Sequence, residues 1–262
     1  MGVADRLDLT LRLVQGSADR TSVSDLARRL SVSEMTVRRD LDALERQGLV
    51  RRVHGGAVAT RTRAEEAGFS ARDAWQTATK DRLGAAVAAL VEPGSRVLLD
   101  AGTTTVHVAE HLAARAPLTV AVLSLQAAVR LADLPGVELL VVGGRSRAGE
   151  RSLVGPLALR TLESLAFDTF VMSIGGVHAE HGWSEFSLED AAVKQAGLAQ
   201  ADRTVVVADA TKLGVRAFSQ VAPLRAADHF VTDRAATDAA AHPSGPSTLD
   251  ALREAGVEVT TA

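Results

Sequence analysis

The chain has 262 residues, no cysteine and a formal net charge of −3. Disulfides, thiolate metal sites and a cysteine nucleophile are therefore excluded, and the total charge gives no argument for nucleic acid. The charge is uneven, however: residues 1–63 carry 12 basic and 8 acidic residues, and the remainder carries 17 and 24. A basic head on an acidic body, with an apolar content of 47%, predicts two parts with different partners.

The head has the pattern of a helix-turn-helix unit. Residues 5–15 repeat apolar side chains at helical spacing. Two further helices follow, with Ser24 and Ser33 as candidate N-caps, and only "SVS" separates them. Their inward-facing residues are Leu26, Ala27 and Leu30, then Val37, Leu41 and Leu44. A short helix, a tight turn and a longer helix make this unit.

The outward face of the longer helix predicts contact with DNA bases. Its N-terminal end carries Ser33, Met35, Thr36, Arg38 and Arg39. A recognition helix inserts this end into the major groove, where arginine reads guanine and a threonine methyl meets thymine.

Residues 49–60, "LVRRVHGGAVAT", predict a β-hairpin wing around a Gly-Gly turn. Arg51, Arg52 and His54 are candidate phosphate contacts there. The alternative is a solvated helix pair with ordinary surface arginines. The turn spacing, the position of the arginines and the basic wing together favour DNA.

Helix and strand patterns alternate from residue 77 to the C-terminus, which predicts a mostly parallel α/β sheet with helices on both faces. We expect a winged helix-turn-helix domain over 1–59, a linker over 60–76, and an α/β domain over 77–262 that senses an effector and forms oligomers. Ligands of such sheets bind at the carboxyl ends of the strands. The polar residues expected at those ends, besides the first, are Ser124, Gly175, Gly176, Asp209 and Lys212.

The end of the first of these strands, "VLLDAGTTTVHVAEHL", is typical of a phosphate site. The apolar run stops at Asp100, Gly102 permits a tight turn, and Thr103, Thr104 and Thr105 open a helix. The free N–H groups and dipole of a helix start favour an anion, and the hydroxyls add donors. An ordinary helix cap is the alternative. The pattern is neither a P-loop nor a dinucleotide fingerprint.

Only three of the 29 basic residues are lysines, namely Lys80, Lys194 and Lys212. In a chain that uses arginine almost everywhere, a retained lysine indicates a need for a compact charge on a flexible stem. Survival by chance is the other interpretation.

The segment "SVSDLARRLSVSEMTVRRDLDALERQGLVRRVHGGA" resembles the N-terminal signature of the DeoR family of bacterial transcriptional regulators. The body resembles the sensor domain of that family at "LLDAGTTT", "LTVAVLSL", "VGGRSRAGERSLVG", "EDAAVK" and "VVVADATKLG". The resemblance implies a domain related to sugar-phosphate isomerases and coenzyme A transferases that senses phosphorylated sugars. It also implies that Thr36, Arg38 and Arg39 face the operator.

By position, the resemblance implies that Gly102 to Thr105 hold a phosphate and that Lys194, Asp209 and Lys212 face the sugar or the phosphate. Two positions depart from the family. Leu123 replaces a usual Asn, and Asp190 replaces a usual Glu. The loss of a pocket amide suggests an altered ligand, or none.

We therefore expect a DNA-binding transcriptional regulator of carbohydrate genes, a repressor in the common family pattern. A phosphorylated sugar would control it, and a homo-oligomer, dimer or tetramer, would bind a double-stranded operator. Because the chain begins without an apolar signal segment and its apolar runs are short, we expect it to be cytoplasmic, with no membrane partner and no cofactor.

Two alternatives remain open. One is an isomerase-like enzyme with a DNA-binding head, for which Asp100, Asp209 and Glu185 are candidate bases. The acidic strand-end cluster of the related isomerases has no match at "SIGGVHAEHGW", so we expect no catalysis. The other is a DNA-binding protein with a degenerate pocket, which Leu123 favours.

His107 and His111 stand one helical turn apart, which is metal-ligand spacing. The sequence offers no evident third ligand. We therefore expect a surface pair and no metal site.

Overall fold

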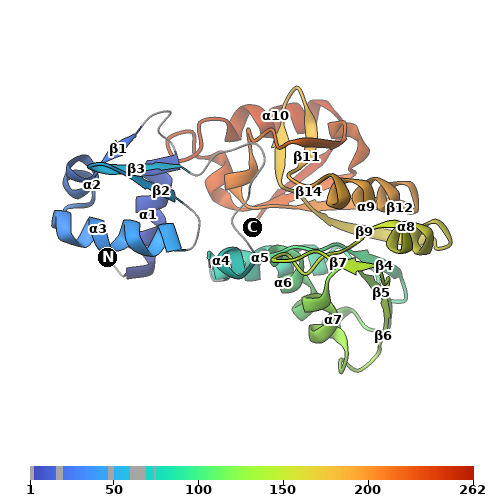
Figure 1. The fold of residues 1–262 in the computed structure, drawn as a ribbon. Helices are drawn as coiled ribbons and strands as arrows, with labels where there is room; N and C mark the ends of the chain where they lie inside the picture. Colours follow the sequence, from blue (N-terminus) through green and yellow to red (C-terminus); the bar gives the residue numbers. More distant parts are fainter. Residues whose placement is uncertain (1–2, 16–19, 47–49, 60–68, 74) are drawn as a thin grey trace. The chain divides into compact units, whose positions relative to one another are not determined.

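The computed structural model of the protein describes residues 3–15, 20–46, 50–59, 69–73 and 75–262 (Figure 1). The chain divides into two compact units, Met1–Arg72 and Asp73–Ala262. Most of the expected linker, residues 60–76, lies outside the described residues, apart from helix α4 (Phe69–Asp73), Trp75 and Gln76. The domain limits expected at residues 59 and 77 stay predictions.

The first unit is a winged helix-turn-helix. Before α4, this unit contains α1 (Val3–Gln15), β1 (Thr21–Ser22), α2 (Val23–Leu30), α3 (Glu34–Arg46), β2 (Val50–Val53) and β3 (Gly56–Ala59). The antiparallel strands lie in the order β1-β3-β2, so the expected hairpin is present. The two-residue strand β1 has no signal in the sequence. It approaches Gly56 so closely that a Cβ there would lie 2.2 Å from the carbonyl oxygen of Thr21.

Serine caps fix the starts of both helices of the motif. Helix α2 begins at Val23, two residues earlier than expected, and its cap is Ser22, whose Oγ accepts from the N–H of Asp25 at 3.1 Å. The expectation for Ser24 is wrong, because Ser24 lies inside the first turn. Ser33 caps α3 as expected, with its Oγ 3.2 Å from the N–H of Thr36.

A small apolar core and one ion pair hold the helices of this unit together. Leu26 on α2 and Val37, Leu41 and Leu44 on α3 are completely buried, as their helical spacing predicts. The guanidinium of Arg6 on α1 forms a fork with the buried carboxylate of Asp40 on α3, at 2.7 and 3.0 Å.

The described part of the second unit is built on a parallel sheet with the strand order β15-β14-β12-β9-β4-β5-β6. Its strands are β4 (Arg96–Leu99), β5 (Leu118–Val122), β6 (Val137–Val141), β9 (Phe167–Ser173), β12 (Ala201–Val207), β14 (His229–Thr232) and β15 (Glu258–Thr261). All of them coincide with expected strand patterns.

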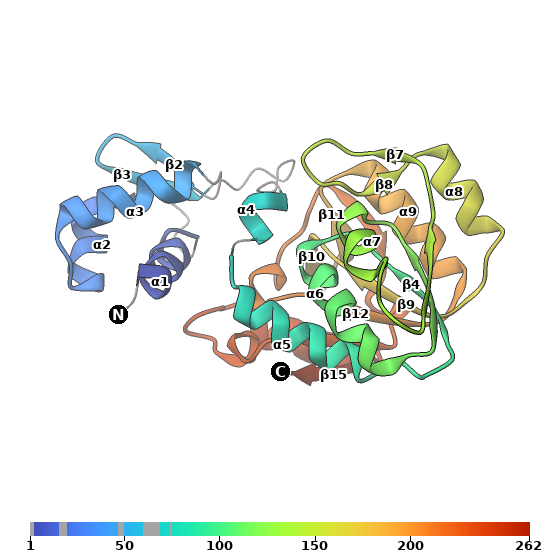
Figure 2. The same cartoon turned by 90° about the horizontal axis from the view of Figure 1, so that it is seen from below.

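Helices cover both faces of the sheet (Figures 1 and 2). Alternate strand residues point to opposite faces, so Val97 and Leu99 pack into one apolar cluster and Leu98 into the other. The first cluster is completed by α5 (Thr77–Ala88), α6 (Thr103–Leu112) and α7 (Leu125–Leu131). The second is completed by α8 (Pro156–Glu163), α9 (Leu188–Ala199) and α10 (Gly245–Glu254).

Short strands outside the main sheet were not foreseen. The strands β10 (Gly176–His178), β11 (Gly182–Glu185) and β13 (Ser219–Ala222) form a small antiparallel sheet, and β7 (Arg145–Ser146) pairs with β8 (Leu153–Val154). Trp183 on β11 anchors the small sheet, since it is fully buried and its indole N–H donates to the carbonyl oxygen of Leu224 at 3.1 Å.

The direction of chain progression through the sheet reverses between β4 and β9. From β4 the chain proceeds outward through β5 and β6, whereas β9 leads through β12, β14 and β15 to the opposite edge. Such a reversal leaves a crevice at the carboxyl ends of the two central strands, which is where open α/β sheets bind ligands. None of the described helices is both long and apolar enough to cross a membrane.

Candidate functional site

The N-terminal end of α3 exposes the residues that the sequence assigned to DNA. Met35 is 60% exposed, and Arg38 and Arg39 are exposed. Arg38 lies 3.4 Å from Glu34 in an exposed pair, which is weak and can exchange for a phosphate or a base. The hydroxyls of Ser33 and Thr36 lie 2.9 Å apart and hold the start of the helix. Ser33 therefore positions the surface, and the arginines remain to contact a ligand.

The wing residues divide into two kinds. Arg51 and His54 are exposed. Arg52 points toward α3, where it forms an ion pair with Asp42 and its backbone N–H donates to Glu45 at 2.7 Å. Arg52 therefore joins the wing to the helix, whereas Arg51 is the wing arginine whose side chain points outward.

In the second unit, a buried ammonium group connects the strand ends at the point of reversal. Lys194 on α9 is 97% excluded from solvent at its side chain and forms an ion pair with Asp100, the residue after β4. Its Nζ also lies 3.3 Å from the carboxylate of Glu185 at the end of β11. It donates to the carbonyl oxygen of Ser173, the last residue of β9, at 3.1 Å. One side chain thus joins three strands to a helix.

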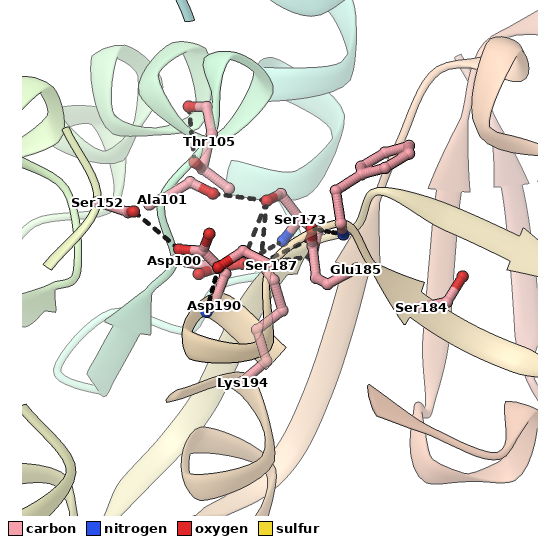
Figure 3. Close-up of polar contacts among 12 residues, drawn as sticks. Asp100, Ala101, Thr105, Ser152, Ser173, Ser184, Glu185, Ser187, Asp190 and Lys194 are labelled. Atoms are coloured by element: carbon pink, nitrogen blue, oxygen red, sulfur yellow. Dashed lines mark hydrogen bonds and ion pairs between the residues drawn. The ribbon is translucent and has the colours of Figure 1, made fainter. Parts of the chain in front are cut away.

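Ser173 completes this cluster from the neighbouring strand (Figure 3). Its backbone N–H donates to Asp100 Oδ2 at 3.0 Å, and its hydroxyl donates to the carbonyl oxygen of Ala101 at 2.6 Å. These bonds satisfy the buried carboxylate and fix the turn that leads into α6. The sequence indicated a polar strand end here, but it did not identify Ser173 as a site residue.

The charge on Lys194 is set by its neighbours. Burial lowers the pKa of Lys194. The carboxylates of Asp100, Glu185 and Asp190 raise it by more than burial lowers it, so the pKa lies above its ordinary value. The ammonium is therefore charged at neutral pH and is already surrounded by acceptors. This differs from the implication that Lys194 faces a sugar or phosphate directly.

Helix α6 begins directly after this cluster and is not capped by a side chain. The N-cap position is Gly102, which has no side-chain cap bond. A Cβ there would lie 2.7 Å from the hydroxyl oxygen of Ser173, so this approach to β9 requires glycine. The first N–H groups of a helix have no acceptor within it. The start of α6 therefore keeps the free donors that bind an anion.

The three threonines at this helix start are not equivalent. Thr105 is completely buried and its hydroxyl donates to the carbonyl oxygen of Gly102 at 3.0 Å. Within the described parts of the chain, the hydroxyls of Thr103 and Thr104 make no such bond. The hydroxyl of Thr105 is thus used inside the helix, and the expectation that all three threonines donate to an anion stays a prediction.

A second polar group lies one turn earlier on α9. Asp190 accepts a hydrogen bond from the hydroxyl of Ser152 at 2.8 Å. Its other oxygen lies 2.7 Å from Nε of Arg147, as an ion pair without hydrogen-bond geometry. The backbone of Ser124 pairs with that of Ser152 in an isolated antiparallel β-bridge, and the hydroxyl of Ser124 caps α7. The sequence identified Ser124 but neither Ser152 nor Arg147, which stand in a loop without a periodic pattern.

Leu123 does not project into this polar group. Its side chain is completely buried in the apolar cluster that contains Leu98, Val142 and Val154. Leucine at this position therefore adds to the apolar core, and the degenerate pocket that Leu123 suggested stays an untested alternative.

The remaining sequence candidates have structural roles. Asp209 caps the 3₁₀ turn η2 (Ala210–Lys212) by accepting from the N–H of Thr211 at 2.9 Å. Gly175 and Gly176 allow close packing, because a Cβ would lie 2.9 Å from the carboxylate of Glu185 and 2.5 Å from the carbonyl oxygen of Val215, respectively. Lys212 is the last residue of this turn and is partly buried.

Known proteins match both units. The family model described as "DeoR-like helix-turn-helix domain" matches residues 8–63, and the one described as "DeoR C terminal sensor domain" matches residues 75–234. The transcriptional regulator YulB of Bacillus subtilis (strain 168) is 32% identical over 260 residues, which cover 99% of this chain and 97% of that protein. The chain belongs to the DeoR family.

Membership in the DeoR family confirms the expected relationship and the expected fold class of a winged helix-turn-helix followed by an α/β sensor domain. It also establishes DNA binding and transcription regulation as the class of function. The transcriptional repressor GlcR of Bacillus subtilis (strain 168) is 34% identical over 82% of this chain and 83% of its own length. Ribose 5-phosphate isomerase A from Methanocaldococcus jannaschii aligns with a TM-score of 0.38 at 15% identity, over 51% of this chain and 53% of that chain.

We expect Lys194→Met to lower the free energy of unfolding by about 3–5 kcal/mol, because it leaves the buried carboxylates without their counter-charge. Adding Asp100→Asn should recover part of the loss, which a double-mutant cycle in urea measures. The control is Arg96→Met, which breaks the exposed pair between Arg96 and Asp168 and should cost no more than about 1 kcal/mol. Equal losses for Lys194→Met and Arg96→Met would contradict a buried, coupled charge cluster.

Proposed function

We propose that this DeoR-family protein is a repressor of carbohydrate-metabolism genes, and that a phosphorylated sugar bound at the strand ends controls its affinity for DNA. The observation that carries the proposal is the uncapped start of α6, which offers free N–H groups and the hydroxyls of Thr103 and Thr104 beside Asp100. A phosphate would accept from the helix start. The nearby Asp190 and Arg147 supply an acceptor and a donor of the kind that orient sugar hydroxyls.

An enzyme reading has no support from the candidate bases. Asp100 is paired with Lys194, Glu185 lies against the same ammonium, and Asp209 caps a turn. A general base needs a lone pair directed at a substrate proton. Regulation by binding requires no such group, and this favours the sensor.

Control of DNA affinity requires that the effector bind two arrangements of the protein with different affinity. The coupling is reciprocal, so an effector that weakens operator binding must itself bind less well when the operator is present. In our proposal, closure around the phosphate at the start of α6 changes the arrangement of the DNA-binding units.

We also propose that the protein acts as a homo-oligomer formed through the β6 edge of the sheet. Strand β6 ends the sheet and exposes Leu140 and Val141, and α7, which packs on β6, exposes Leu125 and Val129. An apolar sheet edge of this kind is a template for pairing with another copy. Two copies would present two recognition helices to a repeated operator.

Replacing Arg39 with alanine is expected to weaken operator binding by about 1–3 kcal/mol, because a bidentate contact to a base edge is lost. Fluorescence anisotropy on DNA from upstream of the protein's own gene measures this. Arg253→Ala on α10, which removes an exposed arginine from the second unit, is the control and should leave affinity unchanged. An Arg39→Ala protein that binds the operator like the wild type would contradict the assigned surface.

Thr103→Val and Thr104→Val are expected to leave operator affinity unchanged without effector and to weaken the response to a sugar phosphate. The loss of one hydroxyl donor to a charged group corresponds to about 1.5–3 kcal/mol. The same anisotropy assay, with a panel of sugar phosphates, measures the shift. Thr105→Val is the matched control, because its hydroxyl bonds to Gly102 and cannot serve a ligand. The assigned site is wrong if Thr105→Val weakens the response to the sugar phosphate while Thr103→Val and Thr104→Val do not.

A double substitution, Val129→Glu and Leu140→Lys, is expected to produce a smaller species in sedimentation velocity and a large loss of operator affinity, because charges would be buried at the proposed interface. Phe218→Glu is the control, because Phe218 is another exposed apolar residue of the second unit. Dissociation caused by Phe218→Glu and not by the double substitution would place the interface on another surface.

A further inference from the structure

The histidine pair on α6 acquires additional ligands in the folded chain. His107 and His111 lie one turn apart, and Glu110 stands between them on the same side of the helix. Helix α5 packs unusually closely on this surface, because a Cβ at Gly84 would lie 2.7 Å from the carbonyl carbon of His107. This approach brings Asp81, one turn earlier on α5, to 2.9 Å from Nε2 of His111. The fold thus places two carboxylates beside the pair, which the sequence did not show, and the expected absence of a metal site stays a prediction.

The ligand atoms are close enough to share one ion. One ligand atom each from Asp81, His107 and Glu110 lies within 4.8 Å of the other two. Nδ1 of His107 faces Glu110 Oε2 at 3.5 Å. His111 joins the group through its contact with Asp81. Three side chains from two helices therefore converge, and His111 lies beside them in contact with Asp81. Ligands placed on helices are the arrangement that holds a metal site accurately.

His107 carries an unusual feature. The residue is only 8% exposed, yet its Nδ1 is buried and has no hydrogen-bond partner among the described residues. Buried polar atoms are almost always satisfied, so an exception needs an explanation. A metal ion between the ring nitrogen and the carboxylate would supply the missing partner.

The carboxylates of Asp81 and Glu110 favour a cation here, and the two neighbouring cations, Arg130 and Lys80, are both engaged. Arg130 holds Oε1 of Glu110 at 3.3 Å, which leaves Oε2 directed at His107. Such an outer contact orients a ligand, as second-shell groups do at metal sites. Lys80, the other nearby cation, donates to the carbonyl oxygen of Trp75 at 2.7 Å.

We propose that Asp81, His107, Glu110 and His111 bind a divalent transition-metal ion, with zinc as the best match. Two imidazoles and two carboxylates form a tetrahedral nitrogen–oxygen set that suits zinc, and the chain has no thiolate to offer. The ion would fasten α5 to α6. Since α6 also begins at the proposed phosphate site, the metal would stiffen the helix whose first turn receives the anion.

A second group of potential ligands, His178, Glu180 and His181 at the turn between β10 and β11, is less suited to an ion. Nδ1 of His178 accepts from the N–H of Glu180 at 3.2 Å, and Nε2 of His181 lies 3.1 Å from the guanidinium of Arg216. One nitrogen of each ring is therefore engaged, and that of His181 lies beside a cation. This group serves as the control.

The test is a titration of the full-length protein, freed of metal by a chelator, with Co²⁺ followed by visible absorbance and with Zn²⁺ followed by calorimetry. The wild type should bind one ion per chain and show the strong visible bands of tetrahedral Co²⁺. Zinc should also raise its Tm, because the ion binds only the folded state. A wild type that shows neither the bands nor saturable zinc binding overturns the proposal without any variant.

The variant Asp81→Asn with His111→Asn removes two ligands at partly exposed positions, so the fold should persist. It should lose the visible bands and bind zinc at least ~100-fold more weakly, beyond the 10–100-fold loss typical of outer-shell substitutions. The control, His178→Asn with His181→Asn, should bind as the wild type does. Loss of binding in the control and not in the variant would assign the metal to the hairpin instead.

Discussion

The second unit depends on one buried charge. Water cannot reach the ammonium of Lys194, so the chain must surround it with acceptors, and these come from the ends of β4, β9 and β11. The charge is stable only when all three ends meet at α9. The ion pair with Asp100 also fixes the turn that opens α6, and through it the direction of the free N–H groups. In this account Lys194 positions the anion site and does not itself contact the ligand.

Local patterns predicted most of the fold. The strands of the central sheet were foreseen because each is a short apolar run between helical patterns, and Ser33 because a cap precedes a periodic helix. The small sheet of β10, β11 and β13 was not foreseen, because its strands, "GVH", "GWSE" and "SQVA", are not apolar runs. The expected cap, Ser24, lies two residues after the observed cap, Ser22, which is within the usual uncertainty at a helix end.

The candidate site was only partly predictable, because its partners meet through the strand order. Asp100 was identified from its place before a helix, and Lys194 from the rarity of lysine and the family resemblance. Nothing in the spacing of residues 100, 173, 185 and 194 indicates that they touch. The order β9-β4 and the reversal between these strands bring them together, and a single sequence does not contain that order. The contact between Asp81 and His111 was likewise not predictable, because it depends on how α5 packs against α6.

The central claim is that a sugar phosphate binds at the uncapped start of α6 and thereby changes DNA affinity. Hydrogen–deuterium exchange of the full-length protein, with and without the sugar phosphate that shifts operator binding, tests it most directly. Free N–H groups at a helix start exchange quickly unless a ligand accepts from them. The account predicts slower exchange at Gly102 to Thr105 when the ligand is bound, whereas the N–H of Val106 already donates to the carbonyl oxygen of Gly102. Unchanged exchange there, with protection appearing elsewhere in the unit, would contradict it.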